Sequence, residues 1–250
     1  MQILIQIKAI FFGLLALLFI LMPGCLIAFP FPLRRRLKMV SPVWRLFGHT
    51  VLRYACSAKI RISEDNRSDE YKTIPAKGLI VANHQSYIDI PLQATIHQTP
   101  PIMKKEVLYI PILGWMAWIS GALPVSRNKS ASRRQVFEKA KKRIKKENIA
   151  LQVYPEGTRS KTARPKEFSE IKKTLLIFAY NEKIPVIPVS MYGTRGVLTS
   201  KGFVRPGRNL GIIVHQEIFP NDFDSSDAFA EACWGKVIQG YDRMKAEIEN

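Results

Sequence analysis

The stretch Asn83–Ile90, NHQSYIDI, follows the short apolar run Gly78–Ala82, GLIVA, and places a histidine and a carboxylate five residues apart. That spacing suits no regular element, because five steps separate two side chains around a helix and put them on opposite faces of a strand. If His84 and Asp89 meet, the backbone changes state between them. Ser86 stands three residues before Asp89, a capping-box pattern that marks the start of a helix. The stretch therefore predicts a strand that ends just before His84 and a helix with Ser86 as its N-cap.

A histidine and an aspartate that meet at such a turn can act together as a general base. The Asp89 carboxylate would bind one imidazole nitrogen of His84, which fixes the tautomer and leaves the other nitrogen to accept a proton from a hydroxyl. Asp89 is also the only aspartate between Asp69 and Asp222, so no neighbouring aspartate could take this role. A plainer reading stays open, in which Asp89 only caps the helix and His84 is a polar turn residue.

Short apolar runs alternate with helical patterns along the rest of the chain. Strands are expected near residues 77–83, 100–104, 121–126, 149–154, 184–191 and 210–218. Helices are expected near residues 86–97, 130–147, 169–181 and 226–248. This alternation indicates an α/β fold, with a mixed, largely parallel central sheet flanked by helices.

Charged and turn-forming residues follow several of the predicted strands. VYPEGTRS, Val153–Ser160, offers a carboxylate, a hydroxyl and a guanidinium around a glycine, which suits a phosphate. GALPVSR ends in an arginine, and MKKE follows another strand. The candidate site residues are Lys105, Arg127, Glu156, Gly157, Thr158 and Arg159. Singly, a basic residue in so basic a chain is more often at the surface. Their shared position beyond the carboxyl ends of strands predicts one site.

The N-terminus predicts attachment to a membrane. Residues 9–33 contain no charge, and about 20 apolar residues suffice to cross a bilayer. The basic cluster Arg34–Lys38 that follows favours the cytoplasmic side for the rest of the chain. Prolines and a glycine interrupt the run, so no continuous straight helix is expected past Met22. A short span and a bent, one-leaflet insertion both fit, whereas a cleaved signal peptide is disfavoured by the long apolar region.

Two units are expected: residues 1–60 as membrane anchor and amphipathic helix, and residues 61–250 as one α/β catalytic domain. The amphipathic pattern covers residues 39–58 and fits either the membrane interface or packing on the domain. The polar residues 63–72 predict a surface loop. The basic helical pattern near 130–147 fits a solvated face better than a specific anion site.

Composition narrows the partners. The chain has 38 basic and 20 acidic residues, a net charge of +18, so anionic partners are expected: nucleic acid, acidic lipid or phosphorylated substrates. Three scattered cysteines support neither a disulfide framework nor a metal site, which predicts a reducing, cytosol-facing domain with no bound metal.

Four ordered blocks resemble those of the 1-acyl-glycerol-3-phosphate acyltransferases, the lysophosphatidic acid acyltransferases within the wider glycerolipid acyltransferases. NHQSYID resembles the family's histidine-x4-aspartate block, GALPVSR its arginine-ending block, YPEGTRS its third block and IPVIPVSMYG its fourth. The resemblance covers about residues 75 to 195 and the membrane-anchoring N-terminus.

This resemblance implies acyl transfer to a glycerol hydroxyl, giving phosphatidic acid without an acyl-enzyme. His84 would deprotonate the hydroxyl, and Asp89 would orient and support the imidazole. The acceptor phosphate would be held and its subsite shaped by Lys105, Arg127, Glu156, Gly157, Thr158 and Arg159. No bound cofactor is implied; acyl-CoA or acyl-carrier protein would be the co-substrate. The partners would be membrane lysophosphatidate and an anionic membrane surface, and nucleic acid is not expected.

Two departures from the family pattern put substrate preference in doubt. Ser126 stands where an acidic residue often precedes the arginine, and Thr174 stands where many members have glycine. Another lysophospholipid, or a lipid with an amino-acid headgroup, therefore stays open as the acceptor. An alternative of a different class is a membrane-tethered anion-binding protein, although such a protein has no need of a histidine and carboxylate pair.

Overall fold

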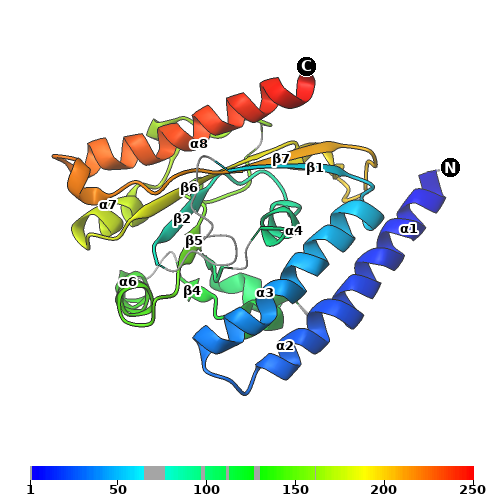
Figure 1. Cartoon of the computed structure of the whole chain (residues 1–250), viewed down its shortest axis with the longest axis horizontal. Helices are drawn as coiled ribbons and strands as arrows, with labels where there is room; N and C mark the ends of the chain where they lie inside the picture. The colour runs from blue at the N-terminus through cyan, green and yellow to red at the C-terminus, as the bar shows by residue number, and fades with distance from the viewer. Residues whose placement is uncertain (1, 65–76, 97–98, 111–112, 127–129, 161) are drawn as a thin grey trace.

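The computed structural model describes residues 2–64, 77–96, 99–110, 113–126, 130–160 and 162–250 (Figure 1). Its centre is a five-stranded sheet with the order β1-β7-β6-β2-β5. The strands are β1 (Lys59–Glu64), β2 (Leu79–Ala82), β5 (Leu151–Val153), β6 (Val186–Tyr192) and β7 (Asn209–Val214). Only the β6–β7 pair is antiparallel within this sheet of the described chain. The expected mixed, largely parallel sheet is confirmed.

A second, two-stranded parallel sheet lies beside the first. It consists of β3 (Ile102–Lys104) and β4 (Leu123–Val125). A parallel bridge between Pro101 and Gln152 joins its edge to β5. The segment that leads into β3 therefore lies against the edge of the main sheet.

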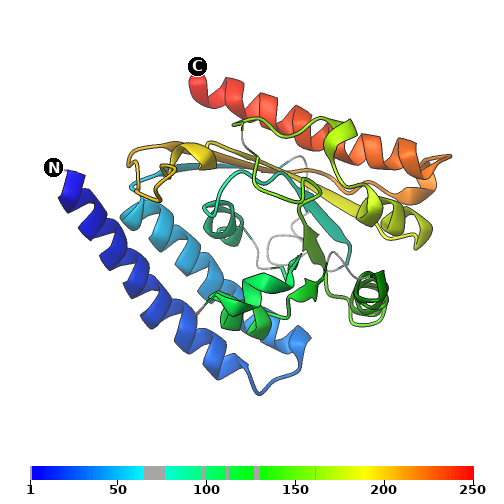
Figure 2. The same ribbon diagram turned by 180° about the vertical axis from the view of Figure 1, so that it is seen from behind.

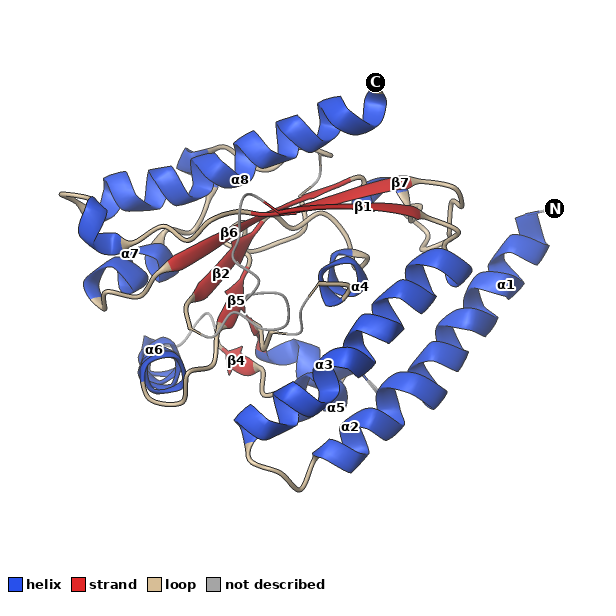
Figure 3. Cartoon of the chain, viewed as in Figure 1, coloured by secondary structure: helices blue, strands red, loops and turns tan. Residues whose placement is uncertain are grey.

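Helices cover both faces of the main sheet, as Figure 3 shows. Leu79 and Val81 of β2 point into the core that holds α6 (Ser130–Lys145), α7 (Thr174–Asn181) and α8 (Ser226–Glu249). Ile80 and Ala82 alternate with them and point into the core beneath α4 (Asp89–Ala94). Because both faces are buried, β2 is apolar at every position, as is typical of parallel strands.

The N-terminal segment is one long helical run. It passes from α1 (Gln2–Leu15) through the π-helical turn Ala16–Leu21 into α2 (Met22–Ala28). This run, Gln2–Ala28, is long and apolar enough to span a membrane, with a mean hydropathy of 2.7. The sequence predicts no continuous straight helix past Met22; the run stays helical to Ala28, although a π-helical turn interrupts its regular α-helical bonding before Met22. Pro23 sits in the first turn of α2, where its missing N–H does least harm, and the π-helical turn before it absorbs the change in bonding.

The helix α3 (Leu33–Thr50) runs back beside α1 and α2 and continues as the π-helical turn Val51–Ala55 (Figure 2). It starts six residues before the predicted amphipathic helix. Its apolar side chains Val40 and Trp44 are buried, so α3 packs on the domain. Gly48 makes this contact possible, since a Cβ at this position would lie 2.5 Å from the carbonyl oxygen of Pro91 in α4.

The predicted helix near 86–97 starts later than expected. The N-cap of α4 is Ile88, so the prediction of Ser86 as N-cap is wrong. The Ser86 hydroxyl accepts a hydrogen bond from the Ile88 N–H at 3.2 Å, and the Asp89 carboxylate holds the backbone before it in a turn. The capping box is thus half formed: its carboxylate part is present, and its hydroxyl part is not.

Other elements differ from the sequence-based expectation. The expected helix near 169–181 is a 3-10 turn, Phe168–Glu170, followed by α7. The elements β1, α5 (Leu113–Ile119) and the 3-10 turns Lys105–Tyr109, Thr194–Gly196 and Pro220–Asp222 were not predicted. The division expected between residues 60 and 61 falls inside β1. Ser63 and Glu64 of the expected loop belong to β1, and residues 65–72 lie outside the described chain.

Candidate active site

The turn between β2 and α4 brings His84 and Asp89 together. The Nδ1 atom of His84 lies 2.7 Å from Oδ2 of Asp89. The Asp89 side chain is fully buried, whereas the His84 side chain keeps 21% of its surface exposed. The backbone changes from strand to turn to helix within this stretch, which is the change of state that the five-residue spacing requires.

Asp89 is held by more than the imidazole. Its Oδ2 also accepts the N–H groups of Gln85 at 2.7 Å and Ser86 at 2.9 Å, and its Oδ1 accepts the hydroxyl of Thr194 at 2.5 Å. An ionised carboxylate only accepts hydrogen bonds, so His84 Nδ1 carries a proton and donates it. The Nε2 atom is then the basic nitrogen of the ring.

Two further side chains fix the backbone on either side of His84. The Asn83 amide is fully buried, donates to the Met191 carbonyl and accepts from the Met191 N–H, both at 2.8 Å, which ties the end of β2 to β6. Glu156 Oε1 accepts the His84 N–H at 2.8 Å. Burial raises the pKa of Glu156 to about 7, and the nearby Asp89 charge adds to this rise. The imidazole therefore sits on a rigid frame of hydrogen bonds.

The loop after β5 forms a second wall of the site. The Tyr154 ring stacks on the His84 ring, with centroids 4.3 Å apart and planes 21° apart. Burial raises the pKa of the Tyr154 phenol, which stays protonated and donates to Gln93 Oε1 at 3.3 Å. Gly157 has a φ of +69°, a left-handed conformation that allows the chain to turn sharply here. The stack leaves the imidazole little freedom to rotate.

A cavity of about 740 Å³ opens beside this pair, within the usual size range of small-molecule sites. Three exposed cations line it: Lys104, Arg159 and Arg195. We call the exposed part of the lining at Arg159 and Arg195 the outer end of the cavity. Arg195 donates to the Ser160 carbonyl at 2.7 Å, and the Arg159 guanidinium lies 3.9 Å from the centroid of the Tyr87 ring. Among its described lining residues there is no carboxylate. The next part of the wall is apolar and consists of Ile90, Ala94, Ile102, Met103, Val107, Ile110 and Ala117.

The structure distributes the predicted site residues unevenly. His84, Gly157, Thr158 and Arg159 all line the cavity. Glu156 lies behind His84 and bonds its backbone. Lys105 is exposed at the start of a 3-10 turn, and the neighbouring Lys104 lines the cavity in its place. Arg127 falls outside the described residues.

Sequence reasoning missed several residues of the site. Thr194, which bonds Asp89, is 105 residues away in the sequence, and Arg195 follows it. A positional signal existed, since both residues directly follow β6, the strand next to β2. Tyr154 is the first residue of the block YPEGTRS, but its stacking on His84 has no signature in the sequence.

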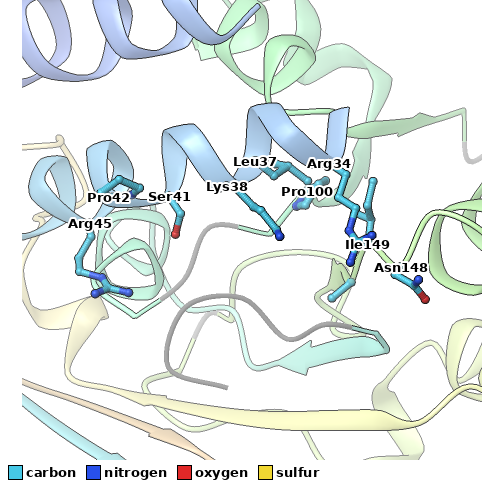
Figure 4. A pocket seen from close by; sticks show the side chains of 10 residues that line it. Arg34, Leu37, Lys38, Ser41, Pro42, Arg45, Pro100, Asn148 and Ile149 are labelled. Atoms are coloured by element: carbon cyan, nitrogen blue, oxygen red, sulfur yellow. The ribbon is translucent and has the colours of Figure 1, made fainter. Parts of the chain in front are cut away.

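A second cavity, of about 540 Å³, lies under α3 (Figure 4). Four polar side chains spaced along one face of α3 project toward it: Arg34, Lys38, Ser41 and Arg45. Asn148, Ile149 and Ala150, just before β5, close its other side. The groove is strongly basic, and no acidic side chain is present among its lining residues in the described chain.

Comparison with known proteins gives a consistent result. A family model described as Acyltransferase matches residues 61–192. An uncharacterized acyltransferase of Schizosaccharomyces pombe is 36% identical over 169 residues, which cover 61% of this chain and 58% of that protein. A 1-acyl-sn-glycerol-3-phosphate acyltransferase of Saccharomyces cerevisiae is 35% identical over 127 residues, which cover 49% of this chain and 41% of that protein. The chain thus spans about half the length of these relatives.

A solved structure shares the fold over nearly the whole chain. The crystal structure of the 1-acyl-sn-glycerophosphate (LPA) acyltransferase PlsC from Thermotoga maritima superposes with a TM-score of 0.79. It covers 98% of this chain and 96% of its own, at 23% sequence identity.

Proposed function

The chain belongs to the acyltransferase family, and from that premise we propose that it acylates the free hydroxyl of 1-acyl-glycerol-3-phosphate with an acyl thioester, giving phosphatidic acid. The observation that carries this proposal is the His84 imidazole at the wall of a partly apolar cavity, with its Nδ1 bonded to the buried Asp89. A membrane-tethered protein that only binds anions does not need this pair. Relatives named for this activity, in yeast and in bacteria, support the choice of acceptor.

In the proposed reaction, His84 Nε2 takes the proton of the acceptor hydroxyl as its oxygen attacks the thioester carbonyl carbon. A new carbon–oxygen bond forms, and the tetrahedral adduct collapses as the carbon–sulfur bond breaks. The thiolate leaves and receives the proton from the imidazolium. Asp89 keeps the imidazole in the reactive tautomer and stabilises the imidazolium, as in other histidine–carboxylate pairs.

The acceptor phosphate is proposed to lie at the outer end of the cavity. Arg159, which follows Thr158 in the sequence, and Arg195 supply positive charge there, and Lys104 adds a further positive charge to the cavity lining. An arginine can bind two phosphate oxygens at once, which positions the glycerol backbone as well as binding it. The acyl chain of one substrate would occupy the apolar wall, since burying hydrocarbon gains about 0.8 kcal/mol per methylene.

The membrane is proposed to deliver the acceptor. The apolar run Gln2–Ala28 would hold the chain at the bilayer, and the basic helix start at Arg34–Lys38 favours the cytoplasmic side for the catalytic domain. The basic groove under α3 (Figure 4) would then meet phosphates of anionic lipid or of the donor. Coenzyme A or acyl-carrier protein would carry the acyl group.

A panel of acceptors and donors, with products measured by lipid mass spectrometry, tests the proposal. The purified full-length chain should convert 1-acyl-glycerol-3-phosphate faster than lysophosphatidylcholine, lysophosphatidylethanolamine or an amino-acid lysolipid. A clear preference for one of the other acceptors would reject 1-acyl-glycerol-3-phosphate as the substrate but would still support acyl transfer as the reaction. No acyl transfer with any pair would reject the proposed function.

A further inference from the structure

Three residues that line the same cavity as His84 each carry a buried polar atom without a hydrogen-bond partner in the described chain. The three atoms are Nε1 of Trp44, Oγ1 of Thr99 and Oγ of Ser120. Only 7%, 6% and 2% of the surfaces of Trp44, Thr99 and Ser120 are exposed. Buried polar groups are nearly always hydrogen-bonded, so three unpaired polar atoms on the residues of one cavity indicate a missing hydrogen-bond partner.

The fold places the three residues in neighbouring elements, and we call this part of the lining the inner end of the cavity. Trp44 of α3 packs in one apolar cluster with Ile119, the residue before Ser120. Thr99 stands two residues before Pro101, whose carbonyl accepts the N–H of Leu123, three residues after Ser120. By contrast, Thr158, Arg159 and Arg195 at the outer end are exposed. The inner end is thus the buried part of the cavity lining, and the outer end is its exposed part.

A line of polar side chains connects the two ends. Tyr154, stacked on His84, bonds Gln93, and the Gln152 amide also donates to Gln93. The Gln152 N–H donates to the carbonyl of Pro100, the residue after Thr99, at 3.0 Å. The cavity therefore has polar residues beside its apolar ones, since Gln93 lies between Ile90 and Ala94 on one face of α4. An unsubstituted hydrocarbon chain would pack well against the apolar residues only.

We propose that the inner end binds an oxygen carried on the acyl chain, so that the enzyme selects acyl groups with a hydroxyl far from the thioester. This inference rests on the proposed function and specifies its acyl substrate. The Trp44 indole N–H can donate to that oxygen, and the hydroxyls of Thr99 and Ser120 can donate or accept. A plain chain that reaches the inner end would leave these atoms unpaired, whereas a hydroxylated chain would pair them.

A competition experiment tests this proposal. The full-length chain in detergent receives 1-acyl-glycerol-3-phosphate and equal amounts of two acyl-CoA donors of the same length, one plain and one hydroxylated. The hydroxyl is moved along the chain from mixture to mixture, and the two products are measured by mass spectrometry. At one or two adjacent positions the hydroxylated donor should be preferred by at least about tenfold, since sites built to bond a hydroxyl discriminate strongly against its absence.

Substitutions in the cavity should abolish the preference without abolishing turnover. Ser120→Ala and Thr99→Val each remove a hydroxyl with little change in volume, and should lower the preference several-fold. Ser169→Ala, at an exposed serine outside the cavity, is the matched control and should keep the wild-type ratio. A ratio near one at every hydroxyl position in the wild-type chain would overturn the proposal, because water would then satisfy these atoms.

A binding measurement separates this inference from the proposed reaction. Plain and hydroxylated fatty acids of equal length are compared as competitors of a fluorescent fatty acid bound to the full-length chain. If no donor is turned over but the hydroxylated acid still displaces the probe better, the reaction is rejected and the oxygen site is supported. If both acids compete equally at every hydroxyl position, the oxygen site is rejected, whether or not acyl transfer occurs.

Discussion

The two ends of the central cavity differ in how their polar groups are satisfied. Next to the outer end, the buried Asp89 accepts four hydrogen bonds, from His84, Gln85, Ser86 and Thr194, and the imidazole is also stacked on Tyr154. At the inner end, Trp44, Thr99 and Ser120 each bury a polar atom without a partner in the described chain. Under the proposed function, the first end would carry out the proton transfer, and the second would bind the oxygen of the acyl chain. We therefore assign the chemistry to the residues whose hydrogen bonds are complete, and the selection of the acyl chain to the residues whose polar atoms are unpaired.

Substitution of His84 should separate the two ends of the cavity most strongly. Replacing it, His84→Ala, removes the general base, and kcat should fall by about 10³ or more, within or above the usual contribution of such a base. The preference of the inner end for hydroxylated fatty acids in the binding assay should stay unchanged, because that end is built from other residues. The kcat of the purified variant is measured with the preferred acceptor and donor. Its preference for hydroxylated fatty acids is measured in the competition assay.

The matched control is His49→Ala, since His49 is exposed on α3 and does not line the cavity. It should keep kcat within about twofold of the wild-type value. Full activity in His84→Ala would show that the rigid end of the cavity is not the place of proton transfer.

A smaller effect is expected from Arg159→Ala. This change removes one cation from the outer end and should raise the KM of the phosphate-bearing acceptor by about 10- to 100-fold, as expected for a hydrogen-bonded charge pair. The KM of the donor should change little. Arg205→Ala, at an exposed arginine outside the cavity, provides the control. An equal rise in the KM of both substrates would indicate general disturbance of the cavity instead of phosphate binding.

The sequence predicted the outer end better than the inner end for a physical reason. His84 and Asp89 are five residues apart, so a local turn is enough to join them, and the strand and helix patterns around them locate that turn. The contacts of Asp89 with Thr194 and of Asn83 with Met191 join residues 105 and 108 positions apart, and depend on the pairing of β2 with β6. No local pattern contains that pairing.

The inner end had no signal in the sequence at all. Trp44, Thr99 and Ser120 are ordinary residues of an amphipathic helix, a loop and a helix end, and only the fold brings them to one cavity. The same limit explains the misplaced start of α4. Ser86 and Asp89 match a capping box, but Asp89 bonds the imidazole and the backbone before it, and the helix begins at Asp89 instead.

The smallest effect concerns the stability of the outer end. Burial raises the pKa of Glu156 to about 7 in the folded protein, above its ordinary value of 4.5. The folded state therefore binds more protons than the unfolded state between these values, and the free energy of unfolding should fall as pH rises from about 4.5 to 7. Glu156→Gln removes this pH-dependent part of the free energy of unfolding, on the order of 1–3 kcal/mol. The amide oxygen of the new side chain can still accept the His84 N–H.

Denaturant unfolding at pH 5 and pH 8 measures this difference. The stability of Glu156→Gln relative to the wild-type protein should be greater at pH 8 than at pH 5. Glu231→Gln, at an exposed glutamate of α8, should show no such change. A relative stability independent of pH would mean that Glu156 is ionised in the folded protein throughout this range.

The most direct test of the histidine–carboxylate pair is a double-mutant cycle on kcat/KM with His84→Ala, Asp89→Asn and both together. Asp89→Asn alone should lower kcat/KM by about 10² to 10⁴, because it disturbs the tautomer of His84, and circular dichroism should show a folded protein. Since Asp89 acts through His84, the double variant should be no more than about threefold worse than His84→Ala alone. If the losses in kcat/KM of the two single variants multiply in the double variant, His84 and Asp89 do not act as a pair. Asp89 would then be a structural cap whose loss damages the site independently.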